Sequence, residues 1–432
     1  MLFRFSLYGF LKNQRYFEPF LVLLLLEKGF SFFLIGLLVA FREVTVNLLE
    51  IPSGALADAC GRRISMILSF SAYVVSFLVF ALADAKPVFF AAMVFFGVGE
   101  AFRSGTHKAM IFEWLRLAGR TAERTRVYGY TRSWSQIGSA VSSLLAAAFV
   151  LLADSYAYVF YFAAVPYVLN VVNFLGYPRE LDGAHEKARS TRQVVDHLRA
   201  ALADAVRVRA LRRLVGESMG FEGVFSAAKD YLQPVLQALT VASVAGWALP
   251  FTLSKLSDTQ ETALLVGPVY FVLFLLSAAG SRNAHRAAMA AGSEERAARW
   301  LWGANAAVFA GLAASTYFSV LPVVAAAFVA LHVLQNVWRP ILVSRFDSCS
   351  RESQGATVLS IESQAQRAAT MIVAPLLGWA VDLVRLGGPG GEFWPVGVVG
   401  AVAALFFFVT ASSASPRTPL TGPRRRTRSG SR

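Results

Sequence analysis

The sequence predicts an all-α membrane protein with twelve transmembrane helices, arranged as two pseudo-symmetric bundles of six. Three observations predict this fold class: a composition that is 56% hydrophobic and only 16% charged, a regular series of long apolar stretches, and a similarity between the two halves of the chain. Soluble globular proteins are typically about 45–50% apolar and about 25% charged, whereas this chain has a mean hydropathy of +0.52. We therefore expect a multi-pass membrane protein.

Each apolar stretch is long enough to cross a bilayer, because about 20 apolar residues span the hydrocarbon core. The first stretch could pass for the core of a signal peptide, but Lys12, Arg15 and Glu18 precede it and no A-x-A cleavage site follows. We expect it to be retained as a first helix. The expected spans lie near residues 5–27, 30–57, 64–84, 87–108, 127–152, 156–177, 214–240, 261–282, 298–318, 320–344, 355–383 and 393–412.

A polar, basic segment separates the sixth span from the seventh. Val195, Leu198 and Leu202 recur in it at helical spacing, which predicts an amphipathic helix on the membrane surface. The C-terminal tail is rich in Arg, Pro, Gly and Ser, a composition typical of disorder. The expected organisation is an N-terminal six-helix bundle at 1–177, a cytoplasmic amphipathic linker at 178–213, a C-terminal six-helix bundle at 214–412 and a basic, disordered cytoplasmic tail at 413–432.

The formal net charge of +14 comes from bases between the spans and in the tail, which indicates membrane orientation and no nucleic-acid partner. Alternate loops differ sharply, since those that we expect outside carry only Lys28, Lys86, Lys255 and Arg385. We therefore expect both termini in the cytoplasm and the protein in the plasma (cytoplasmic) membrane. The expected cytoplasmic loops hold Arg62, Arg63, Lys108, Arg116, Arg120, Arg124, Arg126, Arg282, Arg286, Arg296, Arg299, Arg345 and Arg351.

The two halves of the chain resemble each other at two pairs of short segments that match in chain order, one in spans 1 and 7 and one in spans 5 and 11. Many transporters are built by internal duplication, with the solute site between the repeats near the bilayer midplane. The matching segments are 15–19 with 230–234, and Ser135, Gln136 and Asp154 with Ser363, Gln364 and Asp382.

A short charged turn, GALADACGRR at residues 54–63, connects the second span to the third. Gly61 can adopt a positive φ that lets the helices fold back, and Arg62 and Arg63 hold the turn on the cytoplasmic side. The turn resembles the loop between helices 2 and 3 of the major facilitator superfamily, G-x-L-A-D-[RK]-x-G-R-[RK], and Ala59 departs from it. The matching residues are Gly54, Leu56, Ala57, Asp58, Gly61, Arg62 and Arg63.

The resemblance implies the superfamily's fold and its way of working. It implies that Asp58 and Arg62 hold the cytoplasmic ends of the two halves together in the outward-open state, beside the start of helix 11. It also implies that helices 1, 2, 4, 5, 7, 8, 10 and 11 line or flank a central cavity. The charges within the spans of this chain follow that division.

Charged residues inside a span cost roughly 2.5–3.5 kcal/mol each on insertion scales, so we expect them to face a cavity or a partner. Glu43, Asn47 and Glu50 recur at i, i+4 and i+7, which puts them on one helix face. The residues expected to line a substrate or proton cavity are Glu18, Arg42, Glu43, Asn47, Glu100, Arg103, Arg132, Gln136, Glu222, Asp230, Gln233, Gln364 and Arg367.

The alternative for several of these charges is that they pair with one another and tie helices together, above all Arg42, Glu50, Lys229 and Asp230. A buried carboxylate with an arginine neighbour can load and release a proton as access alternates. We expect Glu43 or Glu18 to be that proton-coupling residue.

The function that these patterns favour is secondary active transport of a small organic solute by alternating access, coupled to protons as a symporter or antiporter, by a monomer in the lipid bilayer. A drug or amphiphile efflux antiporter and a non-transporting receptor on the same fold stay open as alternatives. We do not expect an enzyme, a metal or a cofactor, because five scattered His and two loop Cys form no catalytic or ligand constellation and no phosphate-binding loop is present.

Overall fold

The computed structural model describes residues 1–182, 207–246, 256–349, 355–387 and 390–411, and the regular secondary structure of these residues is entirely helical. Eight helices in this part of the chain are long and apolar enough to cross a membrane. The linker expected at 178–213 lies mostly outside the described residues, as does the tail at 413–432. An all-helical membrane protein is therefore confirmed.

The first half of the chain forms helices at each place where a span was expected. Two short 3₁₀ turns, η1 (Thr121–Glu123) and η2 (Arg179–Asp182), lie between or after them. The helices are α1 (Leu2–Lys12), α2 (Leu21–Glu27), α3 (Phe32–Cys60), α4 (Arg62–Leu82), α5 (Lys86–Arg103), α6 (Thr106–Leu117), α7 (Arg124–Ala153) and α8 (Tyr158–Leu175).

The second half is helical as well. It begins with a segmented helix whose parts are α10 (Arg209–Ser218), a π turn (η3, Met219–Gly223), α11 (Val224–Ala228), a 3₁₀ turn (η4, Lys229–Tyr231) and α12 (Leu232–Gly246). The remaining helices are α13 (Asp258–Ala291), α14 (Glu294–Tyr317), α15 (Leu321–Cys349), α16 (Gly355–Arg385) and α17 (Trp394–Ala411).

Capping residues explain where several helices begin. The Ser31 hydroxyl accepts a hydrogen bond from the Leu34 N–H at the start of α3. Ser257 does the same for Gln260 at the start of α13, where the Gln260 side chain in turn accepts from the Ser257 N–H and completes a capping box. Gly292 ends α13 in the left-handed conformation, with φ of +76°.

Three of the expected spans are interrupted, which the apolar pattern did not predict. The first span breaks between Lys12 and Leu21, where the Gln14 amide donates to the Gly138 carbonyl of α7 and Pro19 has no N–H to offer a helix. The fourth breaks at Gly105, with φ of +72°. In the seventh, the π turn and the 3₁₀ turn change the helical register, a feature common at functional sites.

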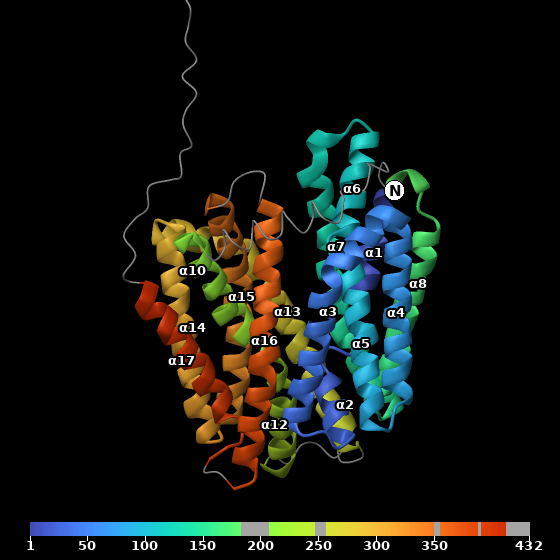
Figure 1. The fold of residues 1–432 in the computed structure, drawn as a ribbon. Coiled ribbons are helices and arrows are strands. Elements are labelled where there is room, and N and C mark those ends of the chain that lie inside the picture. The colour runs from blue at the N-terminus through green and yellow to red at the C-terminus, as the bar shows by residue number, and fades with distance from the viewer. Residues whose placement is uncertain (183–206, 247–255, 350–354, 388–389, 412–432) are drawn as a thin grey trace, which may run out of the picture.

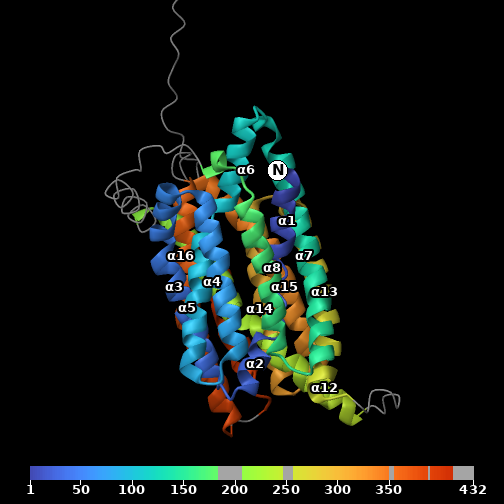
Figure 2. The ribbon, with the colours of Figure 1, turned by 90° about the vertical axis from the view of Figure 1, so that its right-hand side faces the viewer.

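The helices of the two halves lie side by side and meet along two seams (Figures 1 and 2). One seam joins α3 to α16 and the other joins α7 to α13. A Cβ on Gly36 would lie 2.3 Å from the Ala374 carbonyl oxygen, and one on Gly378 would lie 2.1 Å from that of Phe32. Only glycine allows the backbones to approach this closely, so these positions fix the packing of α3 against α16.

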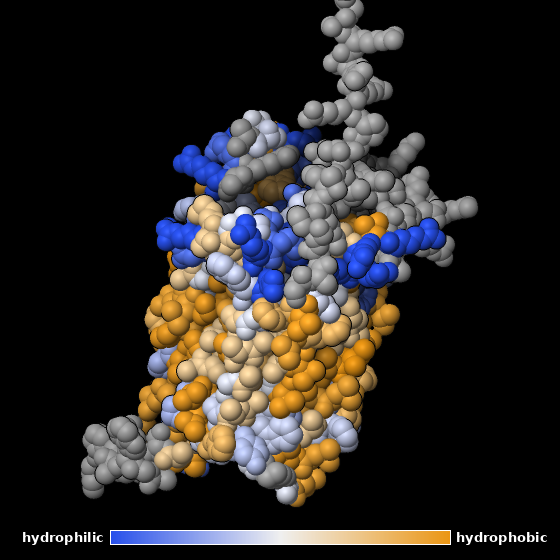
Figure 3. Space-filling view, turned by 90° about the vertical axis from the view of Figure 1, so that its left-hand side faces the viewer, coloured by the Kyte–Doolittle hydropathy of each residue, from blue (hydrophilic) through white to orange (hydrophobic). Residues whose placement is uncertain are grey.

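We call the end of the molecule that holds the N-terminus and α6 the upper end, and the end that holds α2 and α12 the lower end (Figure 1). A broad apolar surface covers the side of the molecule, and hydrophilic side chains gather toward the upper end (Figure 3). Exposed Val402 and Phe406 lie on α17, one of the helices on this side of the molecule. An apolar belt of this kind is what a lipid bilayer covers.

Candidate solute cavity

A cavity of about 670 Å³ lies between the two halves, and both contribute to its lining. Lys12 of α1 and Arg132 of α7 come from the first half, and Tyr270 of α13 and Gln335 of α15 come from the second. Ligand cavities in proteins typically measure about 300–1,000 Å³. The cavity therefore has the size of a small-molecule site.

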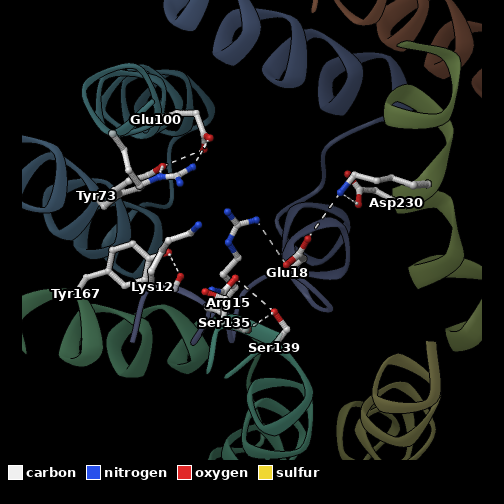
Figure 4. A network of polar contacts seen from close by, with 12 residues as sticks. Lys12, Arg15, Glu18, Tyr73, Glu100, Ser135, Ser139, Tyr167 and Asp230 are labelled. Atoms are coloured by element: carbon white, nitrogen blue, oxygen red, sulfur yellow. Dashed lines mark hydrogen bonds and ion pairs between the residues drawn. The ribbon is translucent and has the colours of Figure 1, made fainter. Parts of the chain in front are cut away.

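A chain of charged side chains crosses this region from one half to the other (Figure 4). Arg15 lies 3.8 Å from Glu18, and Glu18 lies 3.8 Å from the Lys229 ammonium of the other half. Lys229 also lies 3.5 Å from Asp230. The non-helical segment between α1 and α2 carries Arg15 and Glu18, and the 3₁₀ turn η4 carries Lys229 and Asp230, so the breaks in spans 1 and 7 place this chain.

Glu100 and Arg103 form an ion pair on the wall made by the first half. The Tyr73 hydroxyl donates to the second Glu100 oxygen at 2.9 Å. Arg103 lines the central cavity, and Glu100 lines a smaller one of about 250 Å³ beside it. The Glu100–Arg103 pair thus lies between the central cavity and the smaller one.

The smaller cavity holds other residues that the sequence singled out. Arg42 binds Glu43 through two nitrogens, at 2.9 and 2.5 Å from one carboxylate oxygen. Arg367 of α16 also lines this cavity. Glu18 and Asp230 line both cavities, which makes them the predicted carboxylates that are most central.

At the lower end, side chains of one half hydrogen-bond to the backbone of the other. The Gln233 amide donates to the Glu18 carbonyl at 2.9 Å and accepts from the Val22 N–H at 2.8 Å. The Asp382 carboxylate accepts from the N–H groups of Phe32 and Phe33. These bonds close the lower end.

A second closure links α7 to α13 at the same end. The Ser257 hydroxyl donates to Asp154, and the Gln260 amide donates to the Leu151 carbonyl at 2.8 Å. In the nearby loop, burial raises the pKa of Glu392 above its ordinary value, against the opposing effect of Arg385, whose Nε lies 3.3 Å away.

Toward the upper end, the central cavity continues into a hollow of about 1140 Å³, because Arg132, Gln136 and Gln335 line both. Arg282 and Arg286, at its rim on α13, are exposed. The central cavity is thus accessible from the upper end and closed at the lower end.

Four predicted cavity residues make other contacts. The Asn47 amide donates to the Gln364 carbonyl at 3.2 Å in the seam between α3 and α16, and Gln233 takes part in the lower closure. Glu222 is buried in the π turn η3, where the Gln335 amide donates to it at 2.9 Å. The geometry gives Asn47, Gln364, Gln233 and Glu222 helix-to-helix contacts.

The charged turn at 54–63 lies at the upper end. Gly54 belongs to the last turns of α3, and Gly61 has φ of +99° between α3 and α4, as its predicted role in the turn requires. The Arg63 N–H donates to the Asp182 carboxylate at 2.7 Å, and its guanidinium donates to the Tyr177 carbonyl at 3.3 Å. The side chains of Asp58 and Ala59 lie outside the described residues, so the latch expected from Asp58 and Arg62 stays a prediction.

Several polar residues of the site were missed. Lys12, which precedes the apolar part of the first expected span, lines the central cavity. His107 also lines this cavity, is buried and stacks on Tyr8 with ring centroids 3.7 Å apart. Glu362 is fully buried and pairs with Arg339 at 2.6 Å. In the sequence, each of these is an ionisable residue within or beside an expected apolar span, and that position is the feature that could have singled it out.

The model of the Major Facilitator Superfamily matches residues 13–361 of this chain. The chain belongs to the Major Facilitator Superfamily. This confirms the resemblance that the turn at 54–63 indicates, and it agrees with a multi-pass membrane transport protein rather than an enzyme. Over 104 residues, the chain is 31% identical to the uncharacterized MFS-type transporter YxaM of Bacillus subtilis (strain 168), a match that spans 24% of this chain and only 25% of that relative.

Solved structures of other transporters share this fold over nearly the whole length of the chain. The nucleoside transporter NupG matches with a TM-score of 0.72 at 10% identity, over 96% of this chain and 98% of its own. A POT family transporter in complex with 5-aminolevulinic acid matches with a TM-score of 0.66 at 14% identity, over 95% of this chain and 96% of its own. A D-xylose-proton symporter matches with a TM-score of 0.61 at 16% identity, over 94% of this chain and 96% of its own. At these identities, the likeness concerns the fold.

Proposed function

We propose that this chain is a secondary active transporter that moves a small organic solute by alternating access, coupled to protons. The observation that carries the proposal is the central cavity, which lies between the halves, is accessible from the upper end and is closed at the lower end by bonds between the halves. A site that one end alone can reach is what alternating access requires of each conformation.

The proposal includes a topology of twelve crossings, six in each half. Interrupted segments such as α1 with α2, and α10 through α12, each count as one crossing. The upper end faces the cytoplasm, because it carries the exposed bases Arg116, Arg120, Arg282 and Arg286. Both termini are then cytoplasmic, the described conformation is inward-facing, and the protein works as a monomer in the plasma membrane.

Glu18 is the carboxylate that we propose for proton coupling. It lines both cavities and lies between Arg15 of its own half and Lys229 of the other. When the halves separate at the lower end, the distance from Glu18 to Lys229 must change. A carboxylate changes its proton affinity when a neighbouring base moves away, so the conformational change and proton binding are linked. Glu43 is the weaker candidate, because Arg42 of the same helix holds it.

Flux measurements on the purified chain in proteoliposomes test this function. The vesicles are incubated with a mixture of metabolites under an imposed pH gradient, washed, and their contents identified by mass spectrometry. We expect at least one solute to accumulate above the level in protein-free vesicles, and the accumulation to disappear when the gradient is collapsed.

Glu18→Gln is expected to abolish gradient-driven accumulation while keeping exchange of the same solute across the membrane without a gradient. Glu27→Gln, an exposed carboxylate at the end of α2, is the matched control and should behave as the unmodified protein. Accumulation that ignores the gradient would contradict proton coupling. A solute that binds and is never carried across would instead favour the receptor alternative.

A further inference from the structure

More bases than carboxylates line the central cavity and the hollow above it. In the central cavity, the described lining residues include five bases (Lys12, Arg103, Lys108, Arg132 and Lys229) and two carboxylates (Glu18 and Asp230). In the upper hollow, they include four arginines (Arg132, Arg282, Arg286 and Arg339) and no carboxylate. A cavity lined by one sign of charge concentrates ions of the opposite sign.

Ion pairs locate the uncompensated part of this charge. Lys229 lies within 4 Å of Glu18 and of Asp230, and Arg103 is paired with Glu100. Among the described residues, the Lys12 and Lys108 ammonium groups and the Arg132 guanidinium have no carboxylate within that distance. In the central cavity, the excess positive charge therefore lies on the wall made by α1, α6 and α7.

Lys12 and Arg132 belong to helices that are in direct contact. A Cβ on Gly9 of α1 would lie 2.9 Å from the Thr131 carbonyl oxygen of α7. Both bases line the same cavity. An intramembrane charge without a partner is costly, so an anion bound between these two side chains would supply the missing counter-charge.

The second half adds aromatic side chains to the lining, beside polar ones such as Gln335 and Asn336. Phe225 of α11 and Tyr270 and Phe274 of α13 line the cavity from the second half. His332 of α15 contacts Phe225 edge to face, with ring centroids 4.9 Å apart. This wall offers apolar and aromatic surface to the body of a solute.

We infer that the solute is an organic anion, held with its carboxylate or phosphate group between Lys12 and Arg132 and its organic body against Phe225, Tyr270 and Phe274. The inference rests on the proposed transport function and names its substrate class. A solute carrying only positive charge is excluded by the same bases that attract the anion.

Cysteine labelling tests the sign of the cavity without any knowledge of the solute. In a Cys60→Ser, Cys349→Ser background, Ala278→Cys places one thiol where the two hollows meet. Its rates of reaction with 2-sulfonatoethyl methanethiosulfonate and with 2-(trimethylammonium)ethyl methanethiosulfonate are compared with the rates for free 2-mercaptoethanol. We expect the ratio of anionic to cationic reagent to exceed that of the free thiol by about tenfold or more, and to fall as ionic strength rises.

Single charge removals then identify the bases responsible. Lys12→Gln and Arg132→Gln should each lower the ratio severalfold, whereas Lys28→Gln, which pairs with Asp84 at the lower end, should leave it unchanged. Arg132 is exposed in the cavity, so its variant serves if Lys12→Gln fails to fold. A ratio equal to or below that of the free thiol overturns the inference, as does a ratio that neither variant changes.

Thermal unfolding with matched probes tests the ligand class. Phenylacetate is compared with phenylacetamide, and phenyl phosphate with phenol. We expect at least one anion to raise the Tm of the unmodified protein and to lose that effect in Arg132→Gln, and the pair that responds tells carboxylate from phosphate. Stabilisation by the neutral members alone, or by none of the four, overturns the inference.

The two proposals fail differently. Labelling needs no transport, so an anion-selective cavity in a chain that carries no solute would overturn the transport function alone. Uptake of cations only would overturn the substrate class alone.

Discussion

The Asp382 carboxylate accepts hydrogen bonds from the backbone N–H groups of both Phe32 and Phe33, at 3.0 and 2.8 Å. Asp382 lies near the end of α16 in the second half, and the two N–H groups are the first of α3 in the first half. The start of a helix carries partial positive charge. One carboxylate thus joins the two halves at the lower end.

The internal repeat gives this contact a counterpart. Asp154, which matches Asp382 in the repeat, accepts from the Ser257 hydroxyl at the start of α13. Helices α7 and α13 are the counterparts of α16 and α3. The same device therefore closes both seams at the lower end, and it must open for the cavity to be reached from that side.

Replacing Asp382 tests this closure. Asp382→Asn removes the charge and leaves one oxygen for two N–H groups, and hydrogen bonds to charged groups contribute about 1.5–3 kcal/mol. We expect the lower end to open more often. A thiol at Ile35→Cys, buried in α3, in the background lacking Cys60 and Cys349, should react about tenfold faster or more with an impermeant maleimide. Asp84→Asn, an exposed carboxylate at the same end, should have no effect; equal rates in all three proteins would show that Asp382 does not hold the closure.

Ser257 combines a cap with a contact between the halves. Ser257→Ala removes the oxygen that accepts from the Gln260 N–H and the donor to Asp154, and loss of an N-cap costs about 0.5–2 kcal/mol. We expect a lower Tm and faster labelling from the lower end. Ser257→Thr keeps the hydroxyl and should preserve both. If the Ala and Thr variants behaved alike, the hydroxyl would not be the cause.

A buried ion pair stabilises the second half at its upper end. Arg345 lies 2.6 Å from Glu217, both side chains are almost fully buried, and Arg213 also pairs with Glu217 at 2.8 Å. Removing one partner of a buried pair costs about 3–5 kcal/mol, so Arg345→Met should lower the Tm strongly. Arg116→Met removes an exposed partner of Glu113 and should cost no more than about 1 kcal/mol. Similar losses in the two variants would contradict this difference.

The two glycines of the turn at 54–63 should respond in opposite ways. At Gly61, φ is +99° and a Cβ would lie 2.8 Å from the Asp182 carboxyl carbon, so Gly61→Ala should destabilise the protein by roughly 1–3 kcal/mol. Gly54 lies in α3 with no atom within 4 Å of an added Cβ among the described residues. Gly54→Ala should raise stability by up to about 1 kcal/mol. Thermal unfolding of the two purified variants provides the comparison, and a stable Gly61→Ala variant would contradict it.

The positions of the helices could be predicted because an apolar stretch must be about 20 residues long to cross a bilayer. The breaks at residues 13–20 and at Gly105 could not, because hydropathy measures how apolar a segment is and not whether its backbone is continuous. These breaks matter for function, since the first one brings Arg15 and Glu18 to the cavity.

Helical spacing likewise predicted which polar residues share a helix face. It could not predict whether that face lies against a cavity or against another helix. Glu43 lines the smaller cavity, whereas Asn47, one turn further along the same face, meets the Gln364 carbonyl of α16. Because Lys12 precedes the apolar centre of the first span, the sequence pattern indicates only a flanking charge there. Its place in the cavity follows only once α1 is known to end there.

Paired spin-label distances in lipid nanodiscs test the central claim, alternating access, most directly. One pair joins exposed Leu152 and Leu386 at the lower end, and the other joins exposed Leu117 and Met289 at the upper end. Our account predicts two populations at each end, with Asp382→Asn shifting the lower pair toward longer distances and the upper pair toward shorter ones. A single distance at either end that does not respond to Asp382→Asn, or distances that lengthen together at both ends, would contradict it.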